Sequence, residues 1–265
     1  MALDADIAHF ARFGFVVLRR AFDPGPLSDE VDQAFREGSR APFEANVGGG
    51  DIGGRYLPMM CERTPVSLTL LDRFAEFATQ LLGAAVLPVR AKGVLYFGST
   101  NWHNDSDQAV PSVSCACYLE SLQAHNGALR VLPGSHRSDF GASVQSRNET
   151  FAALSGLPIE TEPGDAIFFD EHLYHASGGG QNRRQWRVDY VVDPIGTEQE
   201  AVVRDYFAAI FLPGWDGGYD VDLYPTYGAH WRASGRPWLD RLEQLGAHSL
   251  AAAEESASRH EAAEK

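Results

Sequence analysis

Between about residue 85 and residue 195, the sequence consists of short apolar runs separated by turn residues. The runs are rich in valine, isoleucine, leucine, tyrosine and phenylalanine, and glycine, proline and asparagine separate them; examples are AKGVLYFG, SVSCACYLE, ALRVLPG, GDAIFFD and WRVDYVVD. Several short strands at this spacing are typical of an all-β sandwich, barrel or jelly roll. We therefore expect a mainly β fold whose centre is a β-sandwich.

Helical patterns flank this β-region on both sides. The run FVVL (residues 15–18) predicts an early strand, and Thr64 and Pro65 begin a helix that Gly83 ends. Helical spacing returns after about residue 199, and no linker separates the parts. We expect one domain over residues 1–265, made of a helical N-terminal part (1–84), a β-core (85–195) and a helical C-terminal part (196–265).

A glycine-rich segment spans Gly48 to Gly54 in the N-terminal part. It does not match a phosphate-binding loop, because no lysine followed by serine or threonine comes after it. We interpret it as a mobile segment that could act as a lid.

Composition excludes several classes of function. The chain has 265 residues, and its net charge of −14 (22 − 36) disfavours nucleic acid and anionic membrane surfaces as partners. No window approaches the roughly 20 apolar residues of a membrane span, and the N-terminus does not resemble a signal peptide. The three cysteines, Cys61, Cys115 and Cys117, are expected to be buried thiols. We expect a cytoplasmic protein that acts on a small molecule, of undetermined oligomeric state.

The segment WHNDSD contains a histidine and an aspartate two positions apart, His103 and Asp105. Alone, an H-x-D pair is weak evidence for a metal site. A third ligand is available 70 residues after Asp105, at His175, which closely follows the strand GDAIFFD; His172 is an alternative. Two histidines and one carboxylate on one face of a metal are typical of non-haem Fe(II) oxygenases, because three positions stay open for a co-substrate and O₂.

A candidate anion-binding group follows the third ligand. Arg187 lies 12 residues after His175, inside the apolar run WRVDYVV, and a guanidinium can hold a carboxylate through two parallel hydrogen bonds. Ser177 lies two residues after His175 and faces the same side of an extended chain. Arg184 is an alternative to Arg187, which we prefer because a charge within an apolar strand needs a function or a partner.

Taken together, these motifs resemble the phytanoyl-CoA dioxygenase family of Fe(II)- and 2-oxoglutarate-dependent oxygenases. The resemblance covers roughly residues 5–195. Four features in the family's order carry it: the H-x-D of NWHNDSD, the segment NGALRVLPGSHR, the segment EPGDAIFFDEHLYH, and the downstream Ser177 and Arg187.

The resemblance implies a double-stranded β-helix of the jelly-roll, cupin-like type that uses Fe(II), 2-oxoglutarate and O₂. It assigns the metal ligands to His103, Asp105 and His175. It implies that Arg187 and Ser177 bind 2-oxoglutarate, and that Lys92 contacts co-substrate or substrate. Because relatives that halogenate lack the carboxylate ligand, it favours hydroxylation or a related oxidation of an unactivated C–H bond.

Residues for substrate recognition are less constrained by the sequence. Trp102 and Tyr118 could line the pocket or pack in the core, and Arg130 could orient an anionic substrate or pair with an acidic neighbour. Asp107 is a further polar candidate at the mouth. The expected substrate is a small free metabolite of a biosynthetic pathway. The alternative is a non-catalytic small-molecule-binding protein on the same scaffold.

Overall fold

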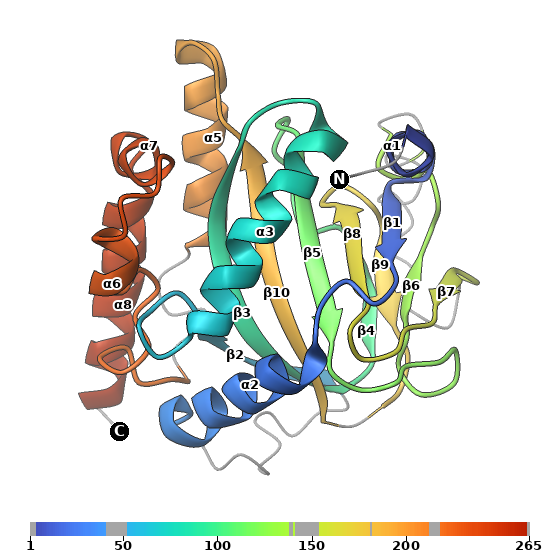
Figure 1. Cartoon of the computed structure of the whole chain (residues 1–265), viewed down its shortest axis with the longest axis horizontal. Coiled ribbons are helices and arrows are strands. Elements are labelled where there is room, and N and C mark those ends of the chain that lie inside the picture. Colours follow the sequence, from blue (N-terminus) through green and yellow to red (C-terminus); the bar gives the residue numbers. More distant parts are fainter. Residues whose placement is uncertain are drawn as a thin grey trace.

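Two antiparallel sheets form the centre of the computed structural model, which describes residues 4–40, 52–137, 140, 154–180, 182–211 and 218–263. The larger sheet has the strand order β1-β8-β5-β10-β3-β2, and the smaller one has the order β4-β9-β6-β7 (Figure 1). The described strands are β1 Phe15–Leu18, β2 Ile52–Pro58, β3 Val86–Gly98, β4 Thr100–His103, β5 Ser112–Tyr118, β6 Leu129–Val131, β7 Leu157–Ile159, β8 Ala166–Asp170, β9 His175–Ser177 and β10 Arg183–Val192. This arrangement is the predicted double-stranded β-helix.

Helices cover one face of the larger sheet and one of its ends. Figure 1 shows α3 lying across β3, β10 and β5, with the C-terminal helices grouped beside the β3 end. The described helices are α1 Asp4–Phe13, α2 Pro24–Gly38, α3 Pro65–Leu82, α5 Thr197–Ile210, α6 Ala229–Arg232, α7 Leu239–Gln244 and α8 Ala247–Ala263. No helix within these described ranges is long and apolar enough to cross a membrane.

Strand β10 separates the apolar core from the interior of the jelly roll. Successive side chains of a strand point to opposite faces. Trp186 and Tyr190 therefore pack against α3, where the indole N–H of Trp186 donates to Oγ of Ser67 at 2.6 Å. Arg187 and Asp189 point to the opposite face and line a pocket. One strand thus carries both the core and the polar interior.

The N-terminal part contains one strand that the sequence analysis did not predict. The early strand (β1) and the helix that begins at Pro65 are confirmed, and Gly83 ends that helix with a left-handed φ of 65°. However, Gly53 and Gly54, interpreted as part of a mobile segment, lie in β2 and pair with β3. The rest of that glycine-rich segment lies outside the described residues.

A buried carboxylate of α2 caps the start of α3. Thr64, at the N-cap position, makes no side-chain capping hydrogen bond. Instead, the carboxylate of Glu30 accepts the backbone N–H groups of Val66 and Ser67 at 2.7 and 2.8 Å. Because the first turn of a helix leaves N–H groups without partners inside the helix, this contact stabilises α3 and fixes it to α2.

We predict that Glu30→Ala lowers the free energy of unfolding by about 2 kcal/mol, because two buried N–H groups lose their acceptor. Urea denaturation of the purified variant measures this change. Asp29→Ala is the matched control, since Asp29 is exposed on the same helix, and we expect it to change the free energy by less than about 0.5 kcal/mol. Equal effects of the two substitutions would contradict the capping role.

Candidate active site

The pairing of β4 with β9 brings two histidines to the same position of the smaller sheet. His103 lies directly opposite His175, and their ring centroids are 4.3 Å apart. Asp105 follows β4 by two residues, and its backbone N–H donates to the carbonyl oxygen of Glu171 at 2.8 Å. Its Oδ1 is 3.8 Å from Nε2 of His103, and its Oδ2 is 3.5 Å from Nε2 of His175. One ligand atom from each of the three residues lies within 4.8 Å of the others, close enough to share one ion.

Backbone carbonyls fix the orientation of both imidazole rings. Nδ1 of His103 lies 2.7 Å from the carbonyl oxygen of Asn101, and Nδ1 of His175 lies 2.9 Å from that of Leu173. Because a carbonyl oxygen only accepts, each Nδ1 carries the proton in these hydrogen bonds. In the neutral rings the lone pair is then on Nε2, which faces Asp105 in both cases.

The ionisation states of the cluster suit a cation. Burial lowers the pKa of His175 to about 4, so its ring is neutral at neutral pH. Burial alone would raise the pKa of Asp105, but the Arg187 guanidinium and the two histidines offset this and hold the pKa well below its usual range. Neutral imidazoles and an ionised carboxylate are the donors that Fe(II) takes in this geometry. The residues present therefore fit an iron ion.

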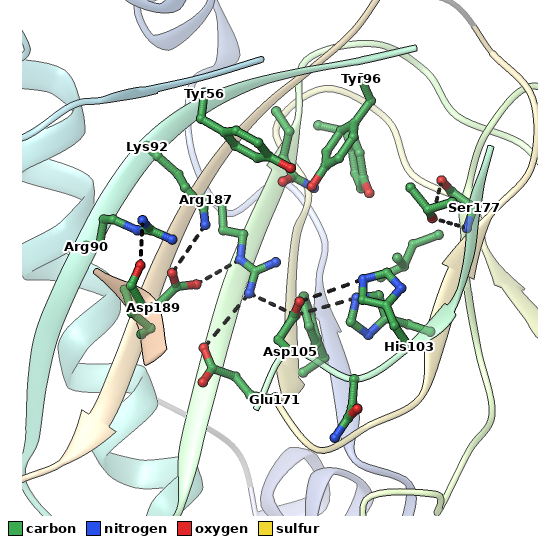
Figure 2. A pocket seen from close by; sticks show the side chains of 18 of the residues that line it. Tyr56, Arg90, Lys92, Tyr96, His103, Asp105, Glu171, Ser177, Arg187 and Asp189 are labelled. Carbon is green, nitrogen blue, oxygen red and sulfur yellow. Dashed lines mark hydrogen bonds and ion pairs between the residues drawn. The ribbon is translucent and has the colours of Figure 1, made fainter. Parts of the chain in front are cut away.

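A pocket of about 400 Å³ opens beside this cluster. Figure 2 shows Arg187 near its centre, with His103 and Asp105 on one side and Asp189, Lys92 and Arg90 on the other. Tyrosine, glutamine and hydroxyl groups complete much of its polar wall, contributed by Tyr56, Tyr96, Thr100, Tyr118, Ser177 and Gln185.

Arg187 is bound by several groups inside the pocket. Its Nη2 donates to Oδ2 of Asp105 at 2.8 Å and to Oγ of Ser114 at 2.6 Å. Its Nε donates to Oδ1 of Asp189 at 2.8 Å, and its Cζ lies 5.3 Å from the ring centroid of Phe169. This arginine therefore contacts the carboxylate of the cluster of His103, Asp105 and His175 directly.

Arg184 lies on the opposite face of β10 from Arg187. Its Nε donates to Oε1 of Glu120 at 2.6 Å, and its Nη1 donates to Oδ2 of Asp32 and Oγ of Ser28 at 2.7 and 3.0 Å. It thus joins the sheet to α2 and does not line the pocket. Of the two arginines considered from the sequence, only Arg187 reaches the cluster.

Two further carboxylates are buried next to Arg187. Glu171 accepts the O–H of Tyr206 at 2.8 Å, and burial together with the charge of Asp189 raises the pKa of Glu171 to about 7. Burial would also raise the pKa of Asp189, but Arg187 and Lys92 hold that pKa at about 2. Nζ of Lys92 is 3.6 Å from Oδ2 of Asp189. The predicted Lys92 thus lies in the pocket, beside this carboxylate.

Ser177 lies in the pocket, and so does Tyr118, for which the sequence left pocket and core open. Oγ of Ser177 is 3.0 Å from Oγ1 of Thr100. The backbone N–H of Ser177 donates to the same Thr100 oxygen at 2.9 Å. The two hydroxyls form a pair on adjacent strands close to His175.

Three candidate substrate residues lie away from the pocket wall. Trp102 precedes His103 on β4, so it points to the other face, where it packs with Tyr174. The guanidinium of Arg130 donates to two loop carbonyl oxygens, and Asp107 accepts the side-chain N–H of Asn104 at 2.8 Å. The structure therefore does not bring Trp102, Arg130 or Asp107 to the site.

Some pocket residues were not found from the sequence. Glu171 and Asp189 are both charged and lie near predicted ligands in the sequence. Because residues two apart on a strand share a face, the position of Asp189 two residues after Arg187 could have indicated that it lines the pocket. Tyr56 stands next to a glycine-rich stretch that did not read as a strand. Tyr206 on α5 does not line the pocket itself, and only the folded structure places its hydroxyl against the lining residue Glu171.

His172, the alternative third ligand, lies outside the cluster, and its ring contacts other protein groups. Its Nδ1 lies 2.8 Å from Oδ1 of Asp170, and its Nε2 lies 2.7 Å from the carbonyl oxygen of Gln108. The hydrogen bond with Asp170, the largest cause, raises the pKa of His172 to about 9. Both ring nitrogens are thus engaged, whereas Nε2 of His175 faces Asp105.

We predict that His172→Gln destabilises the fold in a pH-dependent manner. Because the folded pKa is raised above the unfolded value, the stabilisation is fully present below about pH 6.5 and is lost as the pH rises through about 9. The difference in unfolding free energy from wild type, measured with urea, should therefore be larger at pH 6 than at pH 10. The exposed His125 provides the control substitution, His125→Gln; a pH-independent difference for His172→Gln would contradict the prediction.

A jelly roll with two histidines and one carboxylate at the wall of a pocket is typical of one class of protein, the non-haem Fe(II) oxygenases. Comparison with known proteins refines this class. A family model for phytanoyl-CoA dioxygenase matches residues 10–187, about two thirds of the chain. The chain belongs to the phytanoyl-CoA dioxygenase family, as the motifs predicted.

Individual relatives cover the chain to different extents. Dioxygenase trt7 of Aspergillus terreus is 34% identical over 89 residues, which make up 34% of this chain and 28% of that protein. The chain thus matches little more than a quarter of that relative's length. The ectoine dioxygenase of Bordetella parapertussis is 25% identical over 225 residues, covering 70% of this chain and 72% of that protein.

Solved structures share the fold. The non-haem alpha-ketoglutarate-dependent carbocyclase SnoK from nogalamycin biosynthesis superposes with a TM-score of 0.59 at 14% identity, covering 72% of this chain and 85% of that one. This likeness confirms the predicted jelly-roll fold.

Proposed function

We propose that the chain is an Fe(II)- and 2-oxoglutarate-dependent dioxygenase that hydroxylates, or otherwise oxidises, an unactivated C–H bond of a small metabolite. The observation that carries this proposal is the convergence of His103, Asp105 and His175 at the wall of a pocket that also contains Arg187. When bound, iron with 2-oxoglutarate and O₂ supplies the oxidising chemistry.

In this proposal the three clustered residues hold the iron. His103 and His175 contribute Nε2, which their Nδ1 hydrogen bonds leave unprotonated. Asp105 contributes a carboxylate that Arg187 keeps ionised. The retained carboxylate ligand favours oxidation of the substrate carbon over halogenation.

We assign 2-oxoglutarate to the side of the pocket formed by Arg187 and Ser177. Arg187 keeps terminal N–H groups for a carboxylate. The hydroxyls of Ser177 and Thr100 line the same pocket and lie 3.0 Å apart. Lys92 lines this pocket next to Asp189 and is proposed as a further contact to co-substrate or substrate. Nε and Nη2 of Arg187 already donate to Asp189, Asp105 and Ser114, so Nη1 is the nitrogen that would give the carboxylate a charge-assisted hydrogen bond.

The size and lining of the pocket support a small polar substrate. A volume of about 400 Å³ is in the range of small-molecule sites. Polar side chains supply much of the lining, among them Tyr96, Ser177 and Gln185, and they can form hydrogen bonds with a polar substrate but not with an apolar one. The names of the relatives, ectoine dioxygenase and a nogalamycin-biosynthesis enzyme, support a metabolite of a biosynthetic pathway.

The cellular setting and domain organisation are part of the proposal. The three cysteines are free thiols, which supports a reducing, cytoplasmic compartment. The net charge of −14 disfavours nucleic acid as a partner. One apolar cluster extends from Phe10 through the larger sheet to Ala251, which supports a single domain.

We predict that purified protein supplied with Fe(II), 2-oxoglutarate and O₂ forms succinate, and that His175→Ala reduces this rate to that of a protein-free blank. His172→Ala is the matched control and should retain turnover, because His172 does not face Asp105. Succinate measured by mass spectrometry checks both. A wild type no faster than His175→Ala would favour the second candidate, a non-catalytic binding protein.

The two arginines of β10 provide a test of co-substrate binding. Arg187→Gln should raise the dissociation constant of 2-oxoglutarate roughly thirtyfold or more, the effect of removing one partner of a buried charge pair. Arg184→Gln, which removes a charge from the other face of the same strand, should leave it within about twofold of wild type. Calorimetric titration of 2-oxoglutarate into Co(II)-loaded protein measures both; the reverse ranking would exclude Arg187 as the anchor.

A further inference from the structure

Asp189 is a buried pocket residue to which the proposed reaction gives no role. It is 2% exposed and lies on β10, two residues beyond Arg187 on the same face. Its Oδ1 accepts Nε of Arg187 at 2.8 Å and lies 2.9 Å from Oγ of Ser114. Its Oδ2 lies 3.6 Å from Nζ of Lys92. The charge of a buried carboxylate is costly to desolvate, so these contacts indicate what it is for.

The five N–H groups of Arg187 are divided between different partners. The single Nε–H goes to Asp189, and the two on Nη2 go to Asp105 and Ser114. Nη1 makes no hydrogen bond to the described residues, and Figure 2 shows this nitrogen pointing into the pocket. One edge of the guanidinium is thus fixed by the protein, and two N–H groups remain for a ligand.

The guanidinium is planar and rigid, so its nitrogens cannot move independently. Holding Nε at Asp189 fixes the direction of both Nη1 and Nη2. We propose that Asp189 is a positioning residue that holds Arg187 so that one guanidinium binds both the iron-ligating carboxylate of Asp105 and the far carboxylate of 2-oxoglutarate. This inference rests on the function proposed above. It adds that metal binding and co-substrate binding both depend on the hydrogen bond between Asp189 and Arg187.

Ser114 completes the support from β5. Its hydroxyl accepts Nη2 of Arg187 and lies 2.8 Å from Oε1 of Glu171 as well as 2.9 Å from Asp189. A hydroxyl has one proton, which it gives to one of the two carboxylates at a time. The backbone carbonyl oxygen of Glu171 accepts the backbone N–H of Asp105, and Arg187 donates to the side chain of Asp105.

Three accounts of Asp189 predict different effects of Asp189→Asn. If Asp189 acts only through its charge, its loss makes the site more positive, which weakens binding of a divalent cation and strengthens binding of the 2-oxoglutarate dianion. If Asp189 only stabilises the fold, the fraction of folded protein falls but neither affinity changes. If it positions Arg187 through a charge-assisted hydrogen bond, for which the neutral amide oxygen of asparagine is a weaker acceptor, both affinities fall together.

The test uses calorimetry and does not depend on turnover. Co(II) is titrated into metal-free full-length protein, and 2-oxoglutarate is then titrated into the Co(II)-loaded protein. We expect Asp189→Asn to raise both dissociation constants, each about tenfold, with the stoichiometry of binding unchanged. Asp193→Asn is the matched control: its carboxylate accepts Nε of Arg241 at 2.8 Å outside the pocket, and it should stay within about twofold of wild type.

A fall in both affinities supports the positioning role, and a fall in only one of them overturns it. A weaker Co(II) affinity with a stronger 2-oxoglutarate affinity, or no change in either, overturns the positioning role. If Asp189→Asn does not fold, Ser114→Ala takes its place, and it must weaken both affinities in the same direction. If wild-type protein itself binds neither Co(II) nor 2-oxoglutarate, the proposed function fails, a result distinct from failure of this inference alone.

Discussion

The antiparallel pairing of β4 with β9 is the constraint on which the site depends. It sets His103 opposite His175, although the two residues lie 72 positions apart in the sequence (175 − 103). The chain leaves β4 immediately after His103, so Asp105 reaches the same point from the following loop, where Glu171 accepts its backbone N–H. A shift of one residue in this register would turn one histidine to the opposite face, where Trp102 and Tyr174 now pack.

Strand β10 has a second and different role. Its two faces carry unlike chemistry: aromatic side chains packed against α3 on one side, and charged side chains in the pocket on the other. Packing against α3 fixes the position of β10, and this fixes the backbone from which the Arg187 side chain extends. The buried charges are tolerated because each has partners: Arg187 contacts Asp105 and Asp189, and Lys92 lies 3.6 Å from Asp189.

The sequence was sufficient where the information was local or periodic. The spacing of His103, Asp105 and His175, and the apolar runs around them, predicted a β-core and a cluster that the structure brings together. Information that depends on pairing between distant strands was harder to obtain. β2 was missed because its glycines have low strand propensity. Their strand conformation depends on pairing with β3, which is distant in the sequence. For Trp102 the sequence left pocket and core open, and the structure places it in an apolar cluster, on the side that alternation with His103 indicates.

The central claim is that these three residues hold one iron ion and that Arg187 lies between this ion and the rest of the pocket. The most direct test is anomalous diffraction at the iron edge, from crystals grown anaerobically with Fe(II) and 2-oxoglutarate. The account predicts a single strong peak bounded by His103, Asp105 and His175, with 2-oxoglutarate extending from it to Arg187. A peak that lacks contact with His175, or 2-oxoglutarate bound away from Arg187, would contradict it.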